Sequence, residues 1–248
     1  MLATHVCLLF WQAITHAPCF DELGHLPSGY INWYGNYDAY QVNPPMVRMV
    51  AAAPLIVFGP DLPLFSSEAV GRKRTEVLLA EQFLIIGGVQ SFFWYAIARV
   101  ACFPFSLLGL VLCYLAGQLL FCRSVGNVAC TIWCIHPSVL TYGAMITPDM
   151  ATTVSGFAFT LLWWYWLRRG SWVTTIGLGI LFSMCILTKY VWIVLFPIFP
   201  LFTLLHQHFT NLLDHAAMKT VAVLLICVYF VNAQFGFQES FQIGRAHV

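Results

Sequence analysis

Charged side chains are scarce in this sequence of 248 residues: Asp, Glu, Lys and Arg make up only 8% of it, whereas hydrophobic residues make up 60%. The mean hydropathy of +0.79 is far above that of soluble globular domains, which excludes that class. The net charge is only +1, so nothing indicates a nucleic-acid partner. The nine cysteines show no paired spacing and lie mostly in apolar runs, which indicates small buried hydrophobic residues.

Several apolar runs reach the length of about 20 residues that a helix needs to cross a bilayer. Because lipid offers no partner to backbone amides, such runs must be helical. The sequence therefore predicts an all-α polytopic integral membrane protein. The first span is expected from Met1 to about Ala17; a signal peptide is the alternative, but the charged start and the cleavage site are missing. Further spans, for about seven in all, are expected at 102–121, 126–144, 149–167, 171–188, 190–206 and 219–236.

Most of the charge lies in the long segment 18–100, which also contains two apolar stretches, Met46–Phe58 and Val77–Ala98. These stretches are expected to be helices along the membrane surface or packed on the bundle. Short loops that contain arginine or lysine face the cytoplasm, and here they alternate along the chain, at Arg123, Arg168-Arg169 and Lys219. This pattern places the 18–100 loop, Asp149 and Lys189 together on the opposite, non-cytoplasmic side.

The last six residues, 243–248, match one reading frame of a common sequencing adapter. We therefore expect residues 1–242 to be the N-terminal part of a longer transmembrane domain, and 243–248 to be an adapter scar. A natural polar tail is the alternative.

Three groups of polar residues follow one another along the chain. They are Asp21-Glu22 with His25, Asn43-Pro44-Pro45 with Arg48, and the turns at His136-Pro137, Thr147-Pro148-Asp149 and Thr188-Lys189. In these motifs and their order, the chain resembles the GT-C class of polyprenyl-phosphate-sugar glycosyltransferases. It is most similar to the bacterial glycosyltransferase 39 type, which includes protein O-mannosyltransferases and aminoarabinose transferases.

The resemblance implies a GT-C-like helical bundle in the bacterial inner membrane, with a long periplasmic first loop. It also implies inverting transfer of a sugar from a polyprenyl-phosphate donor to a hydroxyl of an acceptor protein or glycolipid. Family members usually continue into further helices and a soluble domain. Two alternatives stay open: a transporter or flippase of lipid-linked sugars, and an inactive truncated fragment. Transporters typically show internal repeats and charges at the membrane midplane, and neither is visible in this sequence.

Sugar transfer of this kind needs a carboxylate that accepts the proton of the attacking hydroxyl. The resemblance assigns this role to Asp21, the first acid of the pair. Adjacent residues of a helix point about 100° apart, so Glu22 cannot share the role; it either takes another part in catalysis or orients a loop. Both acids could instead stabilise the N-terminus of the helix that follows.

Candidate substrate-binding residues lie on the same predicted face. Lys189 follows an apolar run and is suited to bind the donor phosphate, although a lysine at a helix end can simply extend to the interface. Arg48 and Arg99 are lesser candidates for the phosphate, and Asn43 either bonds a sugar or belongs to a rigid proline turn. The nearby aromatic residues are interpreted as an interfacial belt, with sugar stacking as the alternative: Trp33, Tyr34, Tyr37 and Tyr40.

Asp149 opens a predicted helix and is either an ordinary N-terminal helix charge or a ligand of the sugar. No cofactor is certain, but a divalent cation is possible, because Asp21, Asp149 and His25 offer ligands suited to one. His25 follows Asp21 by four residues, so one face of a helix can present both.

The topology has a direct test. In a cysteine-free background, single cysteines beside Asp38 and Arg168 are expected to react with a membrane-impermeant thiol reagent from opposite sides, because arginine in a short loop stays cytoplasmic. A cysteine beside Arg123 is the control and should behave like the one beside Arg168. Labelling beside Asp38 and Arg168 from the same side would contradict the topology.

Overall fold

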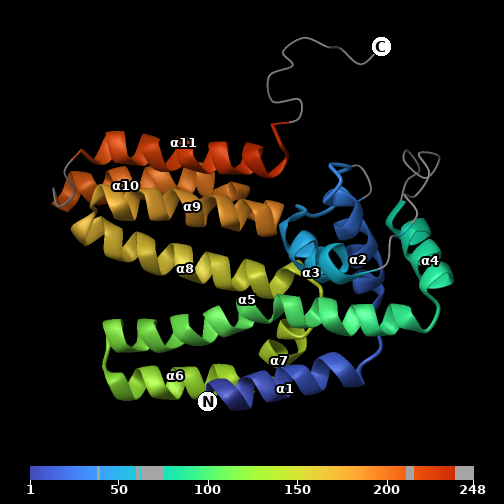
Figure 1. Ribbon diagram of the computed structural model, residues 1–248. Helices are drawn as coiled ribbons and strands as arrows, with labels where there is room; N and C mark the ends of the chain where they lie inside the picture. Colours follow the sequence, from blue (N-terminus) through green and yellow to red (C-terminus); the bar gives the residue numbers. More distant parts are fainter. Residues whose placement is uncertain (38–39, 60–61, 63–74, 211–214, 238–248) are drawn as a thin grey trace, which may run out of the picture. The chain divides into compact units, whose positions relative to one another are not determined.

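The computed structural model describes residues 1–37, 40–59, 62, 75–210 and 215–237 (Figure 1). The tail 243–248, Asp38 and much of the segment between residues 59 and 75 lie outside these ranges. All regular structure within them is helical. In chain order the elements are α1 (Leu2–Thr15), α2 (Phe20–Asn32), α3 (Met46–Phe58), α4 (Thr75–Gly87), α5 (Gln90–Leu120), α6 (Arg123–Ile135), α7 (Pro137–Gly143), α8 (Pro148–Arg169), α9 (Trp172–Thr188), the 3₁₀ helix η2 (Tyr190–Val194), α10 (Leu195–Thr210) and α11 (Ala216–Gln234).

Three segments among the described residues are long and apolar enough to cross a membrane: Gln90–Leu120, Tyr190–Thr210 and Ala216–Gln234. The shorter helices α1, α3 and α9 are apolar as well. The predicted class, an all-α polytopic membrane protein, is confirmed. The expected number of about seven spans stays a prediction.

Two of the predicted helices are interrupted. The helix expected at Val77–Ala98 is wrong as a single helix, because α4 ends at Gly87 and α5 begins at Gln90. Gly88 between them has a φ of +49°, a left-handed conformation that glycine adopts easily and that ends a helix. The helix after this break, α5, runs from Gln90 to Leu120. The span expected at 102–121 therefore begins earlier, at Gln90.

The span expected at 126–144 is also divided, into α6 and α7. His136 between them has an extended conformation, with φ −64° and ψ 125°. The cause is Pro137, since the residue before a proline is disfavoured in the helical region and proline itself donates no backbone hydrogen bond. The remaining predicted spans match α8, α9, η2 with α10, and α11 within a few residues.

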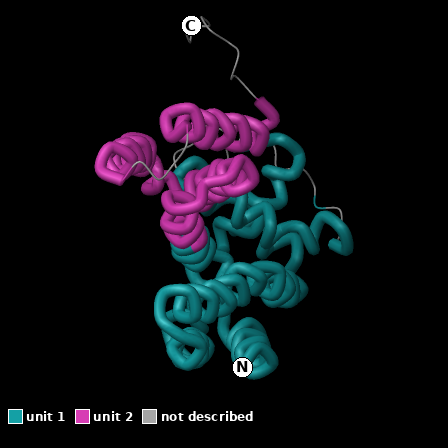
Figure 2. Tube along the Cα trace, turned by 90° about the vertical axis from the view of Figure 1, so that its left-hand side faces the viewer, with its two compact units in different colours: residues 1–157 teal, residues 158–248 magenta. Residues whose placement is uncertain are grey.

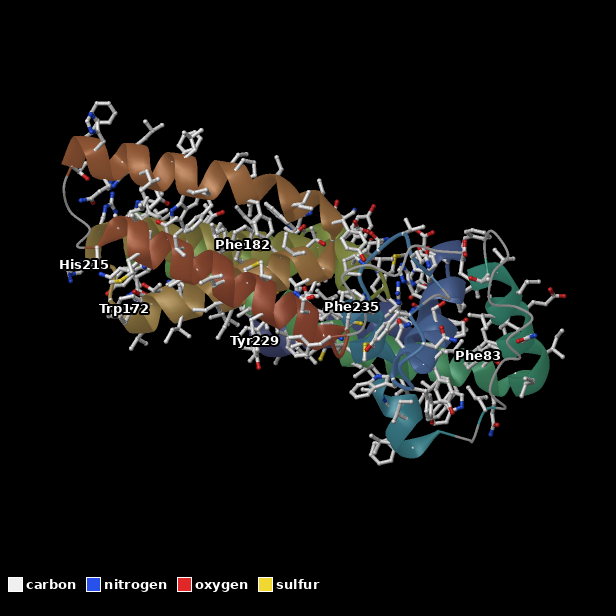
Figure 3. The ribbon with its side chains drawn as sticks, turned by 90° about the horizontal axis from the view of Figure 1, so that it is seen from above. Phe83, Trp172, Phe182, His215, Tyr229 and Phe235 are labelled. Carbon is white, nitrogen blue, oxygen red and sulfur yellow. The ribbon has the colours of Figure 1, made fainter. Side chains whose placement is uncertain are left out.

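The chain forms two compact units, Met1–Phe157 and Ala158–Val248, with the division inside α8 (Figure 2). In the second unit, aromatic side chains of α8, α9 and α10 form the core; Phe182, labelled in Figure 3, is one of them. At one end of this unit, the Lys219 ammonium at the start of α11 donates a 2.7 Å hydrogen bond to the carbonyl of Gly170 after α8. The loops of Arg168-Arg169 and Lys219 therefore lie at the same end of this unit, and the side of the membrane that they face stays a prediction.

In the first unit, α2 lies so close to α3 that only glycine fits between them. A Cβ on Gly29 would stand 2.0 Å from the carbonyl oxygen of Arg48. Within α2, Pro27 has no N–H to donate to the carbonyl of Leu23, and the hydroxyl of Tyr95 from α5 donates to that carbonyl instead, at 3.3 Å. Both contacts fix α2 against its neighbours. The adjoining core includes Phe83 of α4, labelled in Figure 3.

The polar centre of this unit is a buried ion pair between Glu22 of α2 and Arg99 of α5, whose side chains are 0% and 2% exposed. The guanidinium binds the carboxylate with two bonds, Nε to Oε1 at 2.8 Å and Nη2 to Oε2 at 2.6 Å. Such bidentate pairs are the strongest ion-pair geometry in proteins.

Every remaining polar atom of this pair is used as well. Arg99 donates to the carbonyl oxygens of Ala13 at 2.9 Å, His16 at 2.7 Å and Ala17 at 3.0 Å, at the end of α1. Glu22 accepts from the backbone N–H of Cys19 at 2.9 Å, and from that of Ile146 before α8 at 3.0 Å. All five donors of the guanidinium and all four acceptor positions of the carboxylate are therefore filled.

We expect Glu22→Gln to destabilise the protein by about 3–5 kcal/mol, because it leaves the Arg99 charge buried without a counter-charge. The measurement is thermal unfolding in detergent. The double variant Glu22→Leu/Arg99→Met is the control; it removes both charges and should lose less stability than the two single variants together. Unfolding of Glu22→Gln at the wild-type temperature would contradict this role.

Candidate functional site

The candidate site begins with a polar stripe along α2, formed by Asp21, His25, Ser28 and Asn32. Their spacing of four, three and four residues places them on one face of the helix. Asp21 is exposed at the end of the stripe, whereas His25, Ser28 and Asn32 are 4%, 0% and 1% exposed. Glu22 points away from this face toward Arg99, so the structure separates the two adjacent acids, one accessible and one buried.

Arg48 connects this stripe to the Asn43-Pro44-Pro45 segment. Its Nε donates to the side-chain oxygen of Asn32 at 2.6 Å, and its Nη1 donates to the carbonyl of Asn43 at 2.8 Å. Arg48 is 2% exposed, so its charge lies inside the unit. The segment before α3 is thus fixed to α2 through this side chain, which places Asn43 beside the site.

The ring of Tyr40 packs on this stripe. It meets the ring of His25 edge-on, with centroids 4.8 Å apart, and the guanidinium carbon of Arg48 lies 5.0 Å from its centroid. The charges of Asp21 and Glu76 also act on its hydroxyl. Tyr40 therefore belongs to the site, whereas the sequence favoured a place in the aromatic belt.

Asp149 reaches the same site from α8. Ile146, three residues before it, donates its N–H to Glu22 of α2, and the charge of Asp149 acts directly on His25. Four of the sequence-predicted residues of this unit thus gather on or beside the α2 stripe: Asp21, His25, Arg48 and Asp149. Asn43 is held there through its backbone. Lys189 ends α9 in the second unit, and its part in the site stays a prediction.

The environment sets the protonation of two of these groups. Burial raises the pKa of Glu22, but the hydrogen bonds and charge of Arg99 more than offset this, so that its pKa lies below the usual value. The carboxylate is therefore ionised. Burial, with a smaller effect of the Arg48 charge, lowers the pKa of His25 to about 4, against the opposing effect of Asp149 and Glu22. At neutral pH the His25 imidazole is uncharged.

The divalent-cation site considered for Asp21, Asp149 and His25 is not formed. In the described part of the chain, no three His, Cys, Asp or Glu side chains lie close enough together to hold a metal ion. The buried positive charge of Arg48 beside His25 also opposes a second cation there.

Three residues of this site had not been selected from the sequence: Ser28, Asn32 and Glu76. The first two had a visible signal, since they continue the spacing of Asp21 and His25 along one helical face. Glu76 belongs to α4 and has its Cβ 3.2 Å from the position that a Cβ on Gly24 would take. No local pattern indicates that contact.

Comparison with known proteins gives one finding. A family model described as dolichyl-phosphate-mannose-protein mannosyltransferase matches residues 79–233. No curated protein matches the chain, and no solved structure matches it. The match includes Asp149 and Lys189 but begins after Asp21, His25 and Arg48, so the bonds of Glu22 to Arg99 and to the N–H of Ile146 connect the matched part to the part before it.

The neutral state of His25 predicts a pH dependence of stability. Between pH 6.5 and about 4 the unfolded chain binds a proton at this residue and the folded chain does not, so stability rises with pH across this interval and is lost as the pH falls. The lowered pKa of His25 corresponds to a contribution on the order of 3 kcal/mol to the free energy of unfolding at neutral pH. We expect His25→Gln to reduce the change in melting temperature between pH 7 and pH 5. The control is His208→Gln, on an exposed position of α10; an unchanged pH response in His25→Gln would contradict the assignment.

Proposed function

The chain belongs to the dolichyl-phosphate-mannose-protein mannosyltransferase family, and from that premise we propose that it transfers a sugar from a polyprenyl-phosphate donor to an acceptor hydroxyl, with inversion. The coarse class, a membrane glycosyltransferase of the mannosyltransferase type, follows from the family. The donor lipid, the stereochemistry and the placement at the non-cytoplasmic face of a bacterial inner membrane are part of the proposal. An acceptor protein or glycolipid is the partner that it requires.

The observation that carries the proposal is the separation of Asp21 from Glu22. A general base must reach the proton that it takes, and Asp21 is exposed at the end of the polar stripe. Among the described residues the structure records no hydrogen bond or ion pair for the carboxylate of Asp21, which leaves it available as an acceptor. The neighbouring Glu22 is held by four hydrogen bonds, so the backbone that carries Asp21 is fixed in place.

In the proposed reaction the acceptor hydroxyl attacks the anomeric carbon of the donor sugar. Asp21 takes the hydroxyl proton as the new bond forms, and the bond to the polyprenyl phosphate breaks with its electron pair on the phosphate oxygen. Lys189 is the proposed cation for the departing phosphate. Glu22 acts as a positioning residue, because its carboxylate has no free acceptor position.

The other residues of the site are proposed to bind and orient the substrate. The charge of Asp149 acts on His25, and both side chains can form hydrogen bonds with hydroxyl groups. Arg48 holds Asn32 and Asn43, and through them the shape of the site. No step of the proposal requires a metal ion.

Asp21→Asn should lower turnover by 10²–10⁴-fold, since it keeps the size of the side chain and removes the proton acceptor. The assay is transfer from a radiolabelled polyprenyl-phosphate sugar by the full chain in proteoliposomes, with donor binding measured separately and expected to change little. The matched control is Glu81→Gln, the same loss of one exposed carboxylate on α4, which should transfer at the wild-type rate. If Asp21→Asn retained more than about a tenth of the wild-type turnover, Asp21 would not be the base.

A further inference from the structure

Ser28 presents a buried hydroxyl without a partner. The residue is 0% exposed, and among the described residues its Oγ has no hydrogen-bond partner. A serine inside a helix can usually donate to a carbonyl three or four residues back, and Ser28 does not. A buried polar group left without a partner costs about 1–3 kcal/mol, so such a group in a native protein calls for an explanation.

His25 lies one helical turn before Ser28 and has free capacity as well. Its ring contacts Tyr40 edge-on, but within the described ranges neither ring nitrogen has a hydrogen-bond partner. A neutral imidazole offers one donor and one acceptor, and a hydroxyl offers both. Two adjacent groups on one helical face can thus both donate and accept, and neither is satisfied by the protein.

The surrounding charges restrict what can satisfy them. The carboxylates of Asp149 and Glu22 act on His25, and that of Asp21 acts on the adjoining Tyr40, which disfavours a phosphate. The buried guanidinium of Arg48 acts on His25 as well, which disfavours a cation. A neutral group rich in hydroxyls fits both the opposing charges and the mixed donors and acceptors.

We propose that Ser28 and His25 form a subsite that binds the hydroxyl groups of the donor sugar. The proposal rests on the proposed sugar transfer and specifies where the sugar ring is recognised. Asp21 precedes His25 by one turn on the same stripe and is exposed, so the acceptor reaches the base from the open end. The buried part of the stripe is then left for the donor sugar, whose anomeric carbon must lie next to Asp21.

The test compares two lipids, polyprenyl-phosphate mannose and polyprenyl phosphate without sugar. Their direct binding to the full chain in nanodiscs is measured for the wild type and for Ser28→Ala. We expect Ser28→Ala to weaken binding of the sugar-bearing lipid by about 3–10-fold, as for the loss of one neutral hydrogen bond, and to leave binding of the sugar-free lipid unchanged. His25→Leu should show the same selective loss.

Stability separates this role from a structural one. Ser28→Ala removes no hydrogen bond within the protein, so its melting temperature should not fall. The matched control is Ser91→Ala, because Ser91 is also 0% exposed but donates to the carbonyl of Phe83 at 3.2 Å. That control should lower the melting temperature and leave the ratio of the two lipid affinities as in the wild type.

Three results would overturn the subsite: equal weakening of both lipids in Ser28→Ala, no weakening of either, or an effect confined to the KM of the acceptor. Because binding is measured without turnover, the proposed function is judged separately. A wild type that prefers the sugar-bearing lipid, loses that preference in Ser28→Ala and transfers no sugar would retain the subsite and refute the transferase. A wild type that binds both lipids equally would refute the subsite alone.

Discussion

The buried ion pair between Glu22 and Arg99 is the interaction on which the first unit depends. It links segments that are far apart in sequence: the end of α1, the start of α2, the middle of α5 and the turn before α8. A buried charge pair is stable only when its remaining donors and acceptors are also satisfied. Here they all are, so the pair holds four segments in one arrangement.

This anchor also explains how two adjacent acids come to differ in chemistry. Glu22 is ionised, buried and fully hydrogen-bonded. Asp21, the residue directly before it, is a carboxylic acid exposed to solvent. The 100° turn between neighbours on a helix is what separates them. A fixed acid beside a free one gives the free carboxylate a defined position without using up its capacity to accept a proton.

Much of the fold could be predicted from the sequence, because the signals are local. Apolar runs of sufficient length predict helices in lipid, and most of the predicted boundaries lie within a few residues of the observed ones. The interruptions were missed although their causes are also local: the left-handed Gly88 and the proline at 137 act on one or two residues inside runs that are otherwise uniformly apolar. The average hydropathy of a run hardly changes at such a break, so it does not predict the interruption.

The site was harder to predict, because its partners are distant along the chain. Arg99 binds an acid 77 residues away, and no pattern near either residue indicates the pair. The motifs located Asp21, His25, Arg48 and Asp149, and the stripe brings them to one place. Tyr40 and Glu76 reach the site only through tertiary packing, and such contacts cannot be predicted from local patterns in a single sequence.

The short connection between α1 and α2 has a consequence for how this family can vary. Residues 16–19 form it, and the ion pair binds three of their backbone groups: the carbonyls of His16 and Ala17 accept from Arg99, and the amide of Cys19 donates to Glu22. Adding or deleting one residue here would shift all these groups out of reach of the same two side chains. The two buried side chains therefore set the length of this connection. A change of one residue in the length of the connection would therefore be expected to disturb the ion pair even if both of its side chains were kept.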